Sequence, residues 1–597
     1  MKRADESETV LEIEGLSVEL PKGTDRTYAI QDVSLKVRKK EILCLVGESG
    51  SGKSVTAFSI MGLLEKGALT PVSGAIRMMD ENLLEASDDR LRDLRGAAMS
   101  MIFQEPMTAL NPTMTCGAQI EEVLKTHTDL GQVERAEKIF NILKQVHLPD
   151  PPRMMVSYPH QLSGGQRQRI MIAMALVLEP ALLIADEPTT ALDVTTQAQI
   201  LSLIKEIQET HDTAVLFITH DFGVVAEIAD RVAVMQWGKI VEEGTSSQVL
   251  ANPTHTYTRM LIASVPSFTP TARDRDPVAP TVLKTEGLAK TYKGGTFLMR
   301  KEDVQAASEV DLEIRKGETL GIVGESGSGK STVARCIARL IAPTAGRILI
   351  EGADIAKMST GRLRPYRRRV QIVFQDPYRS LNPRRKVGDS IVEGPMNYGV
   401  GAQEAMERAH ELMNLVRLDP DSLDRFPHQF SGGQRQRICI ARALAMEPQL
   451  LIADEAVSAL DVSVQAQVLN LLDDIRTRLH LAMLFITHDL GVIAEIADHV
   501  AVMYRGKLVE YGDVKSIYEN PQHPYTKALL EAVPIPDPDL ENGREHKIIK
   551  GEIPSPINPP AGCVFHPRCP MAHDGCKKEF PAFREIKPGH WVACTEV

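Results

Sequence analysis

Short apolar runs that end at a glycine or an acidic residue recur along the chain and predict buried strands. They are EILCLVG (41–47), ETLGIVG (318–324), LLIADE (182–187 and 450–455) and LFITHD (216–221 and 484–489). Apolar residues at helical spacing follow in 53–64 and 330–341. Because strands and helices alternate, the pattern predicts an α/β fold with parallel strands. The polar, helix-like stretches 106–160 and 378–428 predict a second, helical lobe in each half.

The same order of motifs occurs twice, so the chain is a tandem repeat. Besides the strands, the paired segments are GESGSGKS (47–54 and 324–331), MIFQEP and IVFQDP (101–106 and 372–377), and QLSGGQRQRI and QFSGGQRQRI (161–170 and 429–438). The period is that of a whole duplicated domain, far longer than a solenoid repeat. We therefore predict domains at 1–266 and 282–533, a Pro-containing linker at 267–281, and a Pro-rich and Cys-rich C-terminal region at 534–597.

Composition narrows the class of protein. The 597 residues are 43% hydrophobic and 25% charged, as expected for globular domains. The net charge of −11 argues against a nucleic-acid binder, which should be basic. No apolar run reaches the ~18 residues needed to cross a bilayer, and the start, MKRADESETV, lacks the apolar core of a secretory signal. These features predict a cytoplasmic protein that reaches a membrane only through a partner.

The repeated glycine-rich loop predicts phosphate binding. Its pattern, G-x-x-x-x-G-K-S, lies between a predicted strand and a predicted helix, which is the context that a phosphate-binding loop requires. Glycines let backbone N–H groups turn toward phosphate oxygens, and the helix N-terminus adds a favourable dipole. The lysine reaches the β- and γ-phosphates and the serine binds Mg²⁺. The predicted ATP-binding residues are Gly47, Glu48, Ser49, Gly50, Ser51, Gly52, Lys53 and Ser54, and Gly324, Glu325, Ser326, Gly327, Ser328, Gly329, Lys330, Ser331 and Thr332.

Acidic pairs at two strand ends predict a magnesium site and a hydrolytic water. The first acid of each pair can hold Mg²⁺, and the second, Glu187 or Glu455, can orient and deprotonate the water. Gln104 and Gln375 could touch Mg²⁺ or that water, although each alone could equally be a surface amide. The predicted Mg²⁺ ligands are Ser54, Gln104, Asp186, Ser331, Gln375 and Asp454.

Two histidines complete the predicted catalytic set. His220 and His488 follow the second acid at the same spacing in both copies. A single histidine at a strand end is more often structural, but the repeated spacing favours a role at the γ-phosphate.

LSGGQ (162–166) and FSGGQ (430–434), taken with the loop, the glutamine, the acidic pair, ALD (191–193 and 459–461) and the histidine, resemble the ATP-binding cassette of ABC transporters. The resemblance implies two cassettes, each with a RecA-like α/β core and a helical subdomain, stacked head to tail. Each ATP would lie between one loop and the other copy's SGGQ, pairing Lys53 with Ser431 and Gly433, and Lys330 with Ser163 and Gly165. The ATP-binding residues that the resemblance adds are Ser163, Gly164, Gly165, Gln166, Ser431, Gly432, Gly433, Gln434, Asp193 and Asp461.

The resemblance also implies an aromatic residue that stacks on the adenine early in each cassette. Tyr292 fits this place in the second copy, whereas the first copy has Leu20. Stacking contributes about 0.5–1.5 kcal/mol beyond burial. We therefore expect weaker ATP binding at the first site, unless Tyr28 fills the gap.

NPTHTYTRMLIASVP (252–266) and NPQHPYTKALLEAVP (520–534) look like the segments that follow the cassettes in ATPases of oligopeptide and dipeptide importers. That likeness implies ATP and Mg²⁺ as ligands, two membrane permease subunits, an extracytoplasmic substrate-binding protein and no nucleic acid. The chain would lie peripherally on the cytoplasmic face of the inner membrane.

The transported solute stays open: peptides are the default, and nickel, opines, glutathione and sugars are alternatives. A soluble tandem ABC ATPase acting on ribosomes or nucleic acid is the second hypothesis. The short Pro-containing linker and the C-terminal position of the cysteines disfavour it. An exporter ATPase is disfavoured only by the resemblance.

Four cysteines gather near the C-terminus: Cys563, Cys569, Cys576 and Cys594. A cytosolic location disfavours disulfides, so clustered thiols suggest a metal. Four thiolates suit tetrahedral zinc or a [4Fe–4S] cluster. Because some members of the importer family carry [4Fe–4S] clusters on such a tail, we prefer the cluster to zinc, with free thiols as the third alternative.

Overall fold

The computed structural model describes residues 8–24, 26–190, 192–271, 273, 278–294, 303–458, 460–538, 549, 551, 553–555, 557 and 559–597. The chain divides into two compact units. The first comprises Met1–Val265 with Val533–His546, and the second comprises Pro266–Ala532 with Lys547–Val597. Parts of the predicted linker and of the Pro-rich stretch lie outside the described residues.

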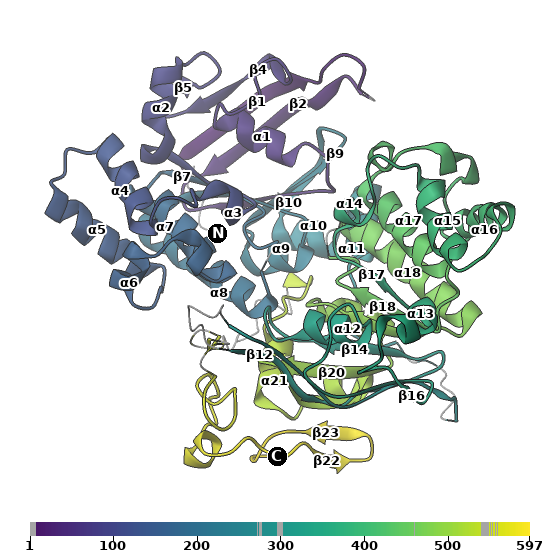
Figure 1. Ribbon diagram of the computed structural model, residues 1–597. Coiled ribbons are helices and arrows are strands. Elements are labelled where there is room, and N and C mark those ends of the chain that lie inside the picture. Colours follow the sequence, from purple (N-terminus) through teal and green to yellow (C-terminus); the bar gives the residue numbers. More distant parts are fainter. Residues whose placement is uncertain are drawn as a thin grey trace. The chain divides into compact units, whose positions relative to one another are not determined.

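An antiparallel sheet forms one layer of the first unit (Figure 1). Its strands, in the order β2-β1-β4-β5, are β1 (Thr9–Glu19), β2 (Tyr28–Arg38), β4 (Thr70–Met78) and β5 (Glu81–Asn82). Ile13 lies opposite Leu35 on one neighbour and Ile76 on the other. All three side chains are buried in the core that this sheet shares with the parallel sheet.

The parallel sheet of the first unit contains the predicted buried strands. In the order β10-β9-β3-β8-β7-β6, its strands are β3 (Ile42–Val46), β6 (Met99–Ile102), β7 (Leu182–Asp186), β8 (Ala214–Thr219), β9 (Arg231–Gln236) and β10 (Lys239–Thr245). All adjacent pairs are parallel except β9 and β10. Leu43 and Leu45 face the core of the antiparallel layer, whereas Cys44 and Val46 face the core of the helices. Burial on both faces explains why β3 is apolar throughout.

The predicted helical lobe is present between β6 and β7. The helices of this unit are α1 (Lys53–Ile60), α2 (Asp88–Ala97), α3 (Pro106–Ala109), α4 (Cys116–His127), α5 (Gln132–Gln145), α6 (Pro151–Val156), α7 (Gly164–Leu176), α8 (Val194–His211), α9 (Phe222–Ile228), α10 (Ser246–Ala251) and α11 (Thr256–Ala263). Helix α1 is shorter than the apolar spacing over 53–64 predicts. It ends at Ile60 because Gly62 takes the left-handed conformation, with φ +62°, that commonly terminates helices.

The second unit repeats this plan. Its antiparallel layer, ordered β12-β11-β15-β16 with β13 also on β11, consists of β11 (Thr281–Tyr292), β12 (Val304–Val310), β13 (Glu313–Arg315), β15 (Ala345–Ile350) and β16 (Ala353–Asp354). The helices are α12 (Lys330–Ile337), α13 (Thr360–Arg369), α14 (Pro377–Ser380), α15 (Val387–Asn397), α16 (Ala402–Leu415), α17 (Gly432–Leu444), α18 (Val462–Leu479), α19 (Leu490–Ile496), α20 (Val514–Glu519) and α21 (Pro524–Glu531).

The C-terminal region extends the main sheet of the second unit. The order is β17-β18-β19-β14-β20-β21-β23-β22. These strands are β14 (Thr319–Val323), β17 (Val370–Val373), β18 (Leu450–Asp454), β19 (Ala482–Ile486), β20 (His499–Tyr504), β21 (Lys507–Asp513), β22 (Arg584–Lys587) and β23 (His590–Val592). Strand β23 pairs antiparallel with β21, with Trp591 opposite Tyr511. Figure 1 shows the hairpin of β22 and β23 in yellow beside the C-terminus. The C-terminal hairpin is therefore part of the sheet that carries the second glycine-rich loop.

The described part of the predicted linker lies against α19. The N–H of Thr271 donates to the Ala494 carbonyl, and the Arg273 guanidinium donates to the carbonyls of Glu495 and Ile496. Within the described residues, no helix combines the length and the apolar character that crossing a membrane requires.

Candidate nucleotide sites

Each glycine-rich loop connects the carboxyl end of a parallel strand to a helix N-terminus, β3 to α1 and β14 to α12. Gly47 and Gly324 have φ of +155° and +146°. A Cβ at Gly47 would lie 2.2 Å from the Met235 carbonyl oxygen, and one at Gly324 would lie 2.1 Å from that of Met503. Only glycine therefore fits at either position. The close approach to the neighbouring strand keeps the loop turned over the helix N-terminus.

The loop lysines lie folded against their own loops. Lys53 Nζ donates to the carbonyl oxygens of Gly47 at 2.6 Å and Glu48 at 3.0 Å. Lys330 Nζ makes the matching bonds to Gly324 and Glu325 at the same distances. Both lysines are 5% exposed. A buried ammonium beside a glycine-rich loop at a helix N-terminus is placed to bind an anion.

A serine and an aspartate meet at each predicted Mg²⁺ position. Ser54 Oγ donates to Asp186 Oδ1 at 3.2 Å, and Ser331 Oγ donates to Asp454 Oδ1 at 2.8 Å. Burial raises the pKa of Asp186 to about 6 and also raises that of Asp454, although the serine hydrogen bonds oppose this. A hydroxyl and a carboxylate are hard oxygen ligands of the kind Mg²⁺ prefers, so the residues present fit the ion.

Glu187 is held by side chains from three segments. It accepts from Gln104 Nε2 at 2.9 Å and Thr190 Oγ1 at 3.0 Å, and its Oε1 lies 3.2 Å from His220 Nδ1. Burial alone would raise the pKa of Glu187, but the hydrogen bond and charge of His220 lower it to about 2. For His220, burial by itself would lower the pKa, but the hydrogen bond and the charge of Glu187 raise it above its usual value. The structure thus joins three predicted catalytic residues into one charged network.

The second acidic pair has a looser network. His488 Nδ1 lies 3.9 Å from Glu455 Oε1, and this histidine lowers the pKa of Glu455. Gln375 is exposed, and the structure does not bring it to the carboxylate as it brings Gln104. Glu187 and Glu455 both adopt left-handed backbone conformations, with φ of +47° and +52°. Such strain at a non-glycine residue is typical of functional sites.

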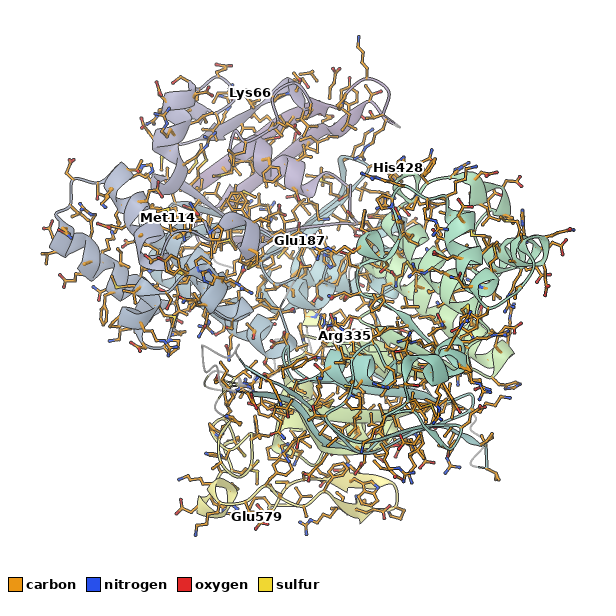
Figure 2. The ribbon with its side chains drawn as sticks, in the orientation of Figure 1. Lys66, Met114, Glu187, Arg335, His428 and Glu579 are labelled. Carbon is orange, nitrogen blue, oxygen red and sulfur yellow. The ribbon has the colours of Figure 1, made fainter. Side chains whose placement is uncertain are left out.

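Figure 2 places Glu187 among packed side chains, while Lys66 projects from the surface.

The SGGQ segments form exposed helix N-termini. Ser163 Oγ accepts from the Gln166 N–H at 3.2 Å and so caps α7, while Ser431 caps α17 in the same way at 3.3 Å. Apart from its chain neighbours and the backbone of its own helix, no heavy atom of the described residues lies within 4 Å of a Cβ added at Gly164 or Gly432. An open, capped helix N-terminus attracts anions.

The remaining predicted residues lie at or beside helix starts. A Cβ at Gly165 would approach Thr196 to 2.7 Å, and one at Gly433 would approach Val464 to 2.2 Å, so each helix pair packs closely here. Asp193 caps α8, and Asp461 occupies the N-cap position of α18.

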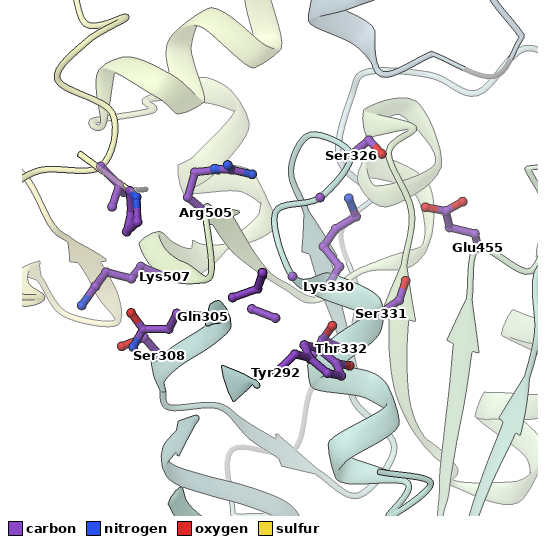
Figure 3. Close-up of a pocket in the computed structure, with 16 residues that line it drawn as sticks. Tyr292, Gln305, Ser308, Ser326, Lys330, Ser331, Thr332, Glu455, Arg505 and Lys507 are labelled. Carbon is purple, nitrogen blue, oxygen red and sulfur yellow. The ribbon is translucent and has the colours of Figure 1, made fainter. Parts of the chain in front are cut away.

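A cavity of about 370 Å³ opens beside the second glycine-rich loop (Figure 3). Its lining residues are Tyr292, Val304, Gln305, Ala306, Ser308, Ser326, Gly327, Gly329, Lys330, Ser331, Thr332, Glu455, Arg505, Lys507, Pro559 and Val564. Tyr292, the residue that the resemblance assigns to adenine stacking, lines this cavity together with the loop residues. In the first unit, Leu20 follows the end of β1, and Tyr28 lies opposite Glu19 on β2.

The sequence missed several residues that hold these loops. The Tyr257 hydroxyl accepts from the Glu48 N–H at 3.2 Å and donates to the Glu48 carboxylate at 3.1 Å. The Tyr525 hydroxyl accepts from the Glu325 N–H at 2.9 Å. The repeated segments 252–266 and 520–534 contain both tyrosines and could have indicated them. Arg568, which pairs with Glu325, has no such signal.

The four C-terminal cysteines come from one small region of the second unit. Cys563 and Cys576 are buried, and the Cys563 N–H donates to the Cys576 carbonyl at 2.7 Å. Burial raises the pKa of Cys563, and the nearby thiols of Cys576 and Cys569 raise it further. Burial and the nearby Cys576 thiol also raise the pKa of Cys594. Among the described residues, however, no set of three or more His, Cys, Asp or Glu side chains is arranged to hold a metal ion.

Comparisons with known proteins identify a family that this chain resembles along most of its length. The family model "ABC transporter" matches residues 30–190 and 307–458, and "Oligopeptide/dipeptide transporter, C-terminal region" matches 241–305 and 509–576. The glutathione import ATP-binding protein GsiA of Salmonella paratyphi A is 44% identical over 99% of this chain and 98% of its own. GsiA of Escherichia coli O157:H7 is 44% identical over 94% and 95%. A solved dimeric ATP-binding cassette, MJ0796 bound to ADP and Pi, is 30% identical over 39% of this chain and 98% of its own, with a TM-score of 0.36.

Proposed function

Because the chain belongs to the ABC transporter family and carries two ABC cassettes, we propose that it is the ATP-hydrolysing subunit of an importer of glutathione or short peptides. The observation that carries this proposal is the oligopeptide/dipeptide C-terminal region, which follows both cassettes. Similarity to glutathione import ATP-binding proteins over nearly the whole chain supports glutathione as the first solute to test. The same matches favour an importer over the ribosomal, nucleic-acid and exporter alternatives.

The side chains of each site have distinct roles in hydrolysis. Lys53 and Lys330 bind the β- and γ-phosphates, and Ser54 with Asp186, or Ser331 with Asp454, holds Mg²⁺. When bound, Mg²⁺ neutralises charge on the phosphates. Glu187 or Glu455 orients and deprotonates the water, as a positioned carboxylate can.

The histidine and the glutamine support that carboxylate. His220 and Gln104 both contact Glu187. His220 would also act at the γ-phosphate, and Gln104 at Mg²⁺ or the attacking water. His488 has the same role toward Glu455.

We propose that each ATP is completed by the signature helix of the other cassette. Ser431 and Gly433 would serve the ATP at Lys53, and Ser163 and Gly165 the ATP at Lys330. The capped, exposed starts of α7 and α17 support this role, because such termini bind phosphate. One chain would then supply both sites without a second ATPase subunit.

We propose two permease subunits and an extracytoplasmic substrate-binding protein as partners, with the chain lying on the cytoplasmic face of the membrane. Binding of ATP would close the cassettes and change the access of the permeases, and hydrolysis would reopen them. Solute selection would then lie in the binding protein and the permeases, which would form the pathway for the solute.

Metal binding by Cys563, Cys569, Cys576 and Cys594 remains a proposal, with a [4Fe–4S] cluster preferred to zinc. Their common location supports it, but the thiols as placed do not form a ligand set. Iron, sulfide and zinc analysis of protein purified without oxygen tests it. A measured content of less than one [4Fe–4S] cluster or one zinc ion per chain would contradict metal binding.

The experiment that tests the importer function is reconstitution of the full chain with its co-purifying permeases in liposomes. Binding protein loaded with glutathione, a short peptide or nothing is added in turn, and ATP hydrolysis and solute uptake are measured. We expect stimulated hydrolysis and uptake with glutathione or peptide. The Glu187→Gln/Glu455→Gln chain serves as the matched control. Co-purification of ribosomes or nucleic acid without permeases would refute the proposal.

A further inference from the structure

The C-terminal tail, defined here as the described residues of 549–597, packs on the second unit through its own core. Phe565 is 1% exposed and lies edge-on to Tyr504, with ring centroids 5.2 Å apart. It also packs against Tyr525 at 5.3 Å. His590 Nε2 lies 2.8 Å from Glu510 Oε1, and both side chains are buried. Together with the pairing of β23 on β21, these contacts hold the tail beside the glycine-rich loop.

Arg568 of the tail makes a two-pronged ion pair with the loop itself. Its Nη1 and Nη2 donate to the two carboxylate oxygens of Glu325 at 2.6 and 2.9 Å. The two side chains are only 2% and 1% exposed. Nη1 also donates to the Tyr504 hydroxyl at 3.3 Å. Burial alone would lower the pKa of Arg568, but Glu325 raises it above its usual value.

The matching glutamate of the first unit has a different partner among the described residues. Glu48, the first-loop counterpart of Glu325, is half-buried, and its carboxylate accepts from the Tyr257 hydroxyl. Gln236 ends β9 where Tyr504 ends β20. Trp237, next to it, is 70% exposed. The second loop is therefore more deeply covered, and its buried carboxylate depends on a cation from a distant segment.

The tail also borders the nucleotide cavity. Pro559 and Val564 line it together with Tyr292, Arg505 and Lys507. Figure 3 shows Arg505 between the tail and the loop residue Ser326. Pro559 and Val564 add apolar surface to a cavity otherwise lined mainly by polar and cationic residues. The flat, apolar part of ATP that such a surface suits is the base.

We propose that the C-terminal tail is a component of the second nucleotide site alone: Arg568 positions the loop through Glu325, and Pro559 with Val564 forms an apolar wall for the base. A buried carboxylate that loses its partner is strongly destabilised. Loss of Arg568 therefore forces Glu325 toward water and displaces the loop that holds the phosphates. This inference rests on the proposed binding of ATP, and it adds a dependence that the first site lacks.

The test measures binding of a fluorescent ATP analogue to the full-length chain at one site at a time. In a Lys53→Ala background only the second site binds, and in a Lys330→Ala background only the first. Arg568→Met is expected to raise Kd at the second site at least about tenfold, or about 1.4 kcal/mol, and to leave the first unchanged. Arg568→Lys should fall between, because lysine cannot make both bonds. Lys577→Met removes an exposed tail cation and serves as the control.

Further variants separate a positioning role from loss of the fold. Replacing Glu325 with Gln together with Arg568→Met removes both charges and should restore most of the affinity, which unfolding of the tail would not allow. Val564→Ala should weaken base binding while Trp591 fluorescence reports an intact tail. Equal loss at both sites, or no loss at either, overturns the inference while ATP binding stands. If neither single-site chain binds ATP before these changes, the proposed function itself fails.

Discussion

Glutamine at positions 187 and 455 tests the assignment of the two hydrolytic carboxylates. Glutamine has the size of glutamate and keeps an oxygen that can accept from Gln104 and Thr190, so the surrounding contacts survive. It removes the charge that pairs with His220 and the group that takes the proton from water. The phosphate-binding lysines and the serine–aspartate pairs are untouched. We therefore expect hydrolysis to fail while ATP binding persists.

The magnitude follows from the role and the geometry. Loss of a positioned general base lowers a rate by roughly 10²–10⁴, or about 3–5 kcal/mol of barrier at 1.36 kcal/mol per tenfold. At the first site His220 holds the pKa of Glu187 near 2, so part of the loss there reflects orientation of the water rather than basicity. Each single variant should lose hydrolytic activity. The double variant should hydrolyse ATP about 10²-fold more slowly, at the lower end of the loss in rate expected for a general base.

The assay is single-turnover hydrolysis by the full chain at saturating ATP, paired with equilibrium binding of a fluorescent ATP analogue. Exposed glutamates on other helices, changed as Glu209→Gln and Glu411→Gln, are the matched controls and should behave as the unchanged chain. A double variant that hydrolyses ATP at the normal rate would refute the assignment of both bases. Loss of ATP binding would instead show that the glutamates support the nucleotide and not the water.

Three further predictions concern Mg²⁺, the base and the tail. Mg²⁺ must displace the proton of Asp186, so its affinity should rise with pH up to about 6 and level off, which a titration from pH 5 to 8 checks and Asp186→Asn should flatten. Because the pKa of Asp186 exceeds the ordinary 3.8, the stability of the folded state without Mg²⁺ should fall as pH rises from about 4 to about 6. Tyr292→Ala should weaken ATP binding at the second site by about 0.5–1.5 kcal/mol beyond lost burial, while Leu20→Tyr strengthens the first; no change in either Kd would contradict stacking. His590→Ala removes a partner of buried Glu510 and should cost about 1–3 kcal/mol in thermal unfolding, with an unchanged Tm as the contrary result.

The local elements of both units could be predicted from the sequence because each depends on neighbouring residues. The apolar runs became β3, β7, β8 and their counterparts, since a strand buried on both faces has to be apolar throughout. The end of α1 was predicted too late, because apolar spacing carries no information on the left-handed turn at Gly62. Gln104 and Gln375 both follow an apolar strand and were expected to have the same role. Among the described contacts, however, Gln104 hydrogen-bonds its carboxylate and Gln375 does not.

The sequence by itself determined the duplication, the α/β class, the phosphate loops and the acids that end their strands. Those features are written in contiguous residues, where backbone geometry and spacing are enough to specify the chemistry. Only the tertiary structure decided which side chains meet across long separations. Arg568 lies 243 residues from Glu325, and the sequence around neither residue predicts that the two form an ion pair. Burial made the pairing necessary, because a carboxylate removed from water needs a cation, and the fold determines which one can reach it.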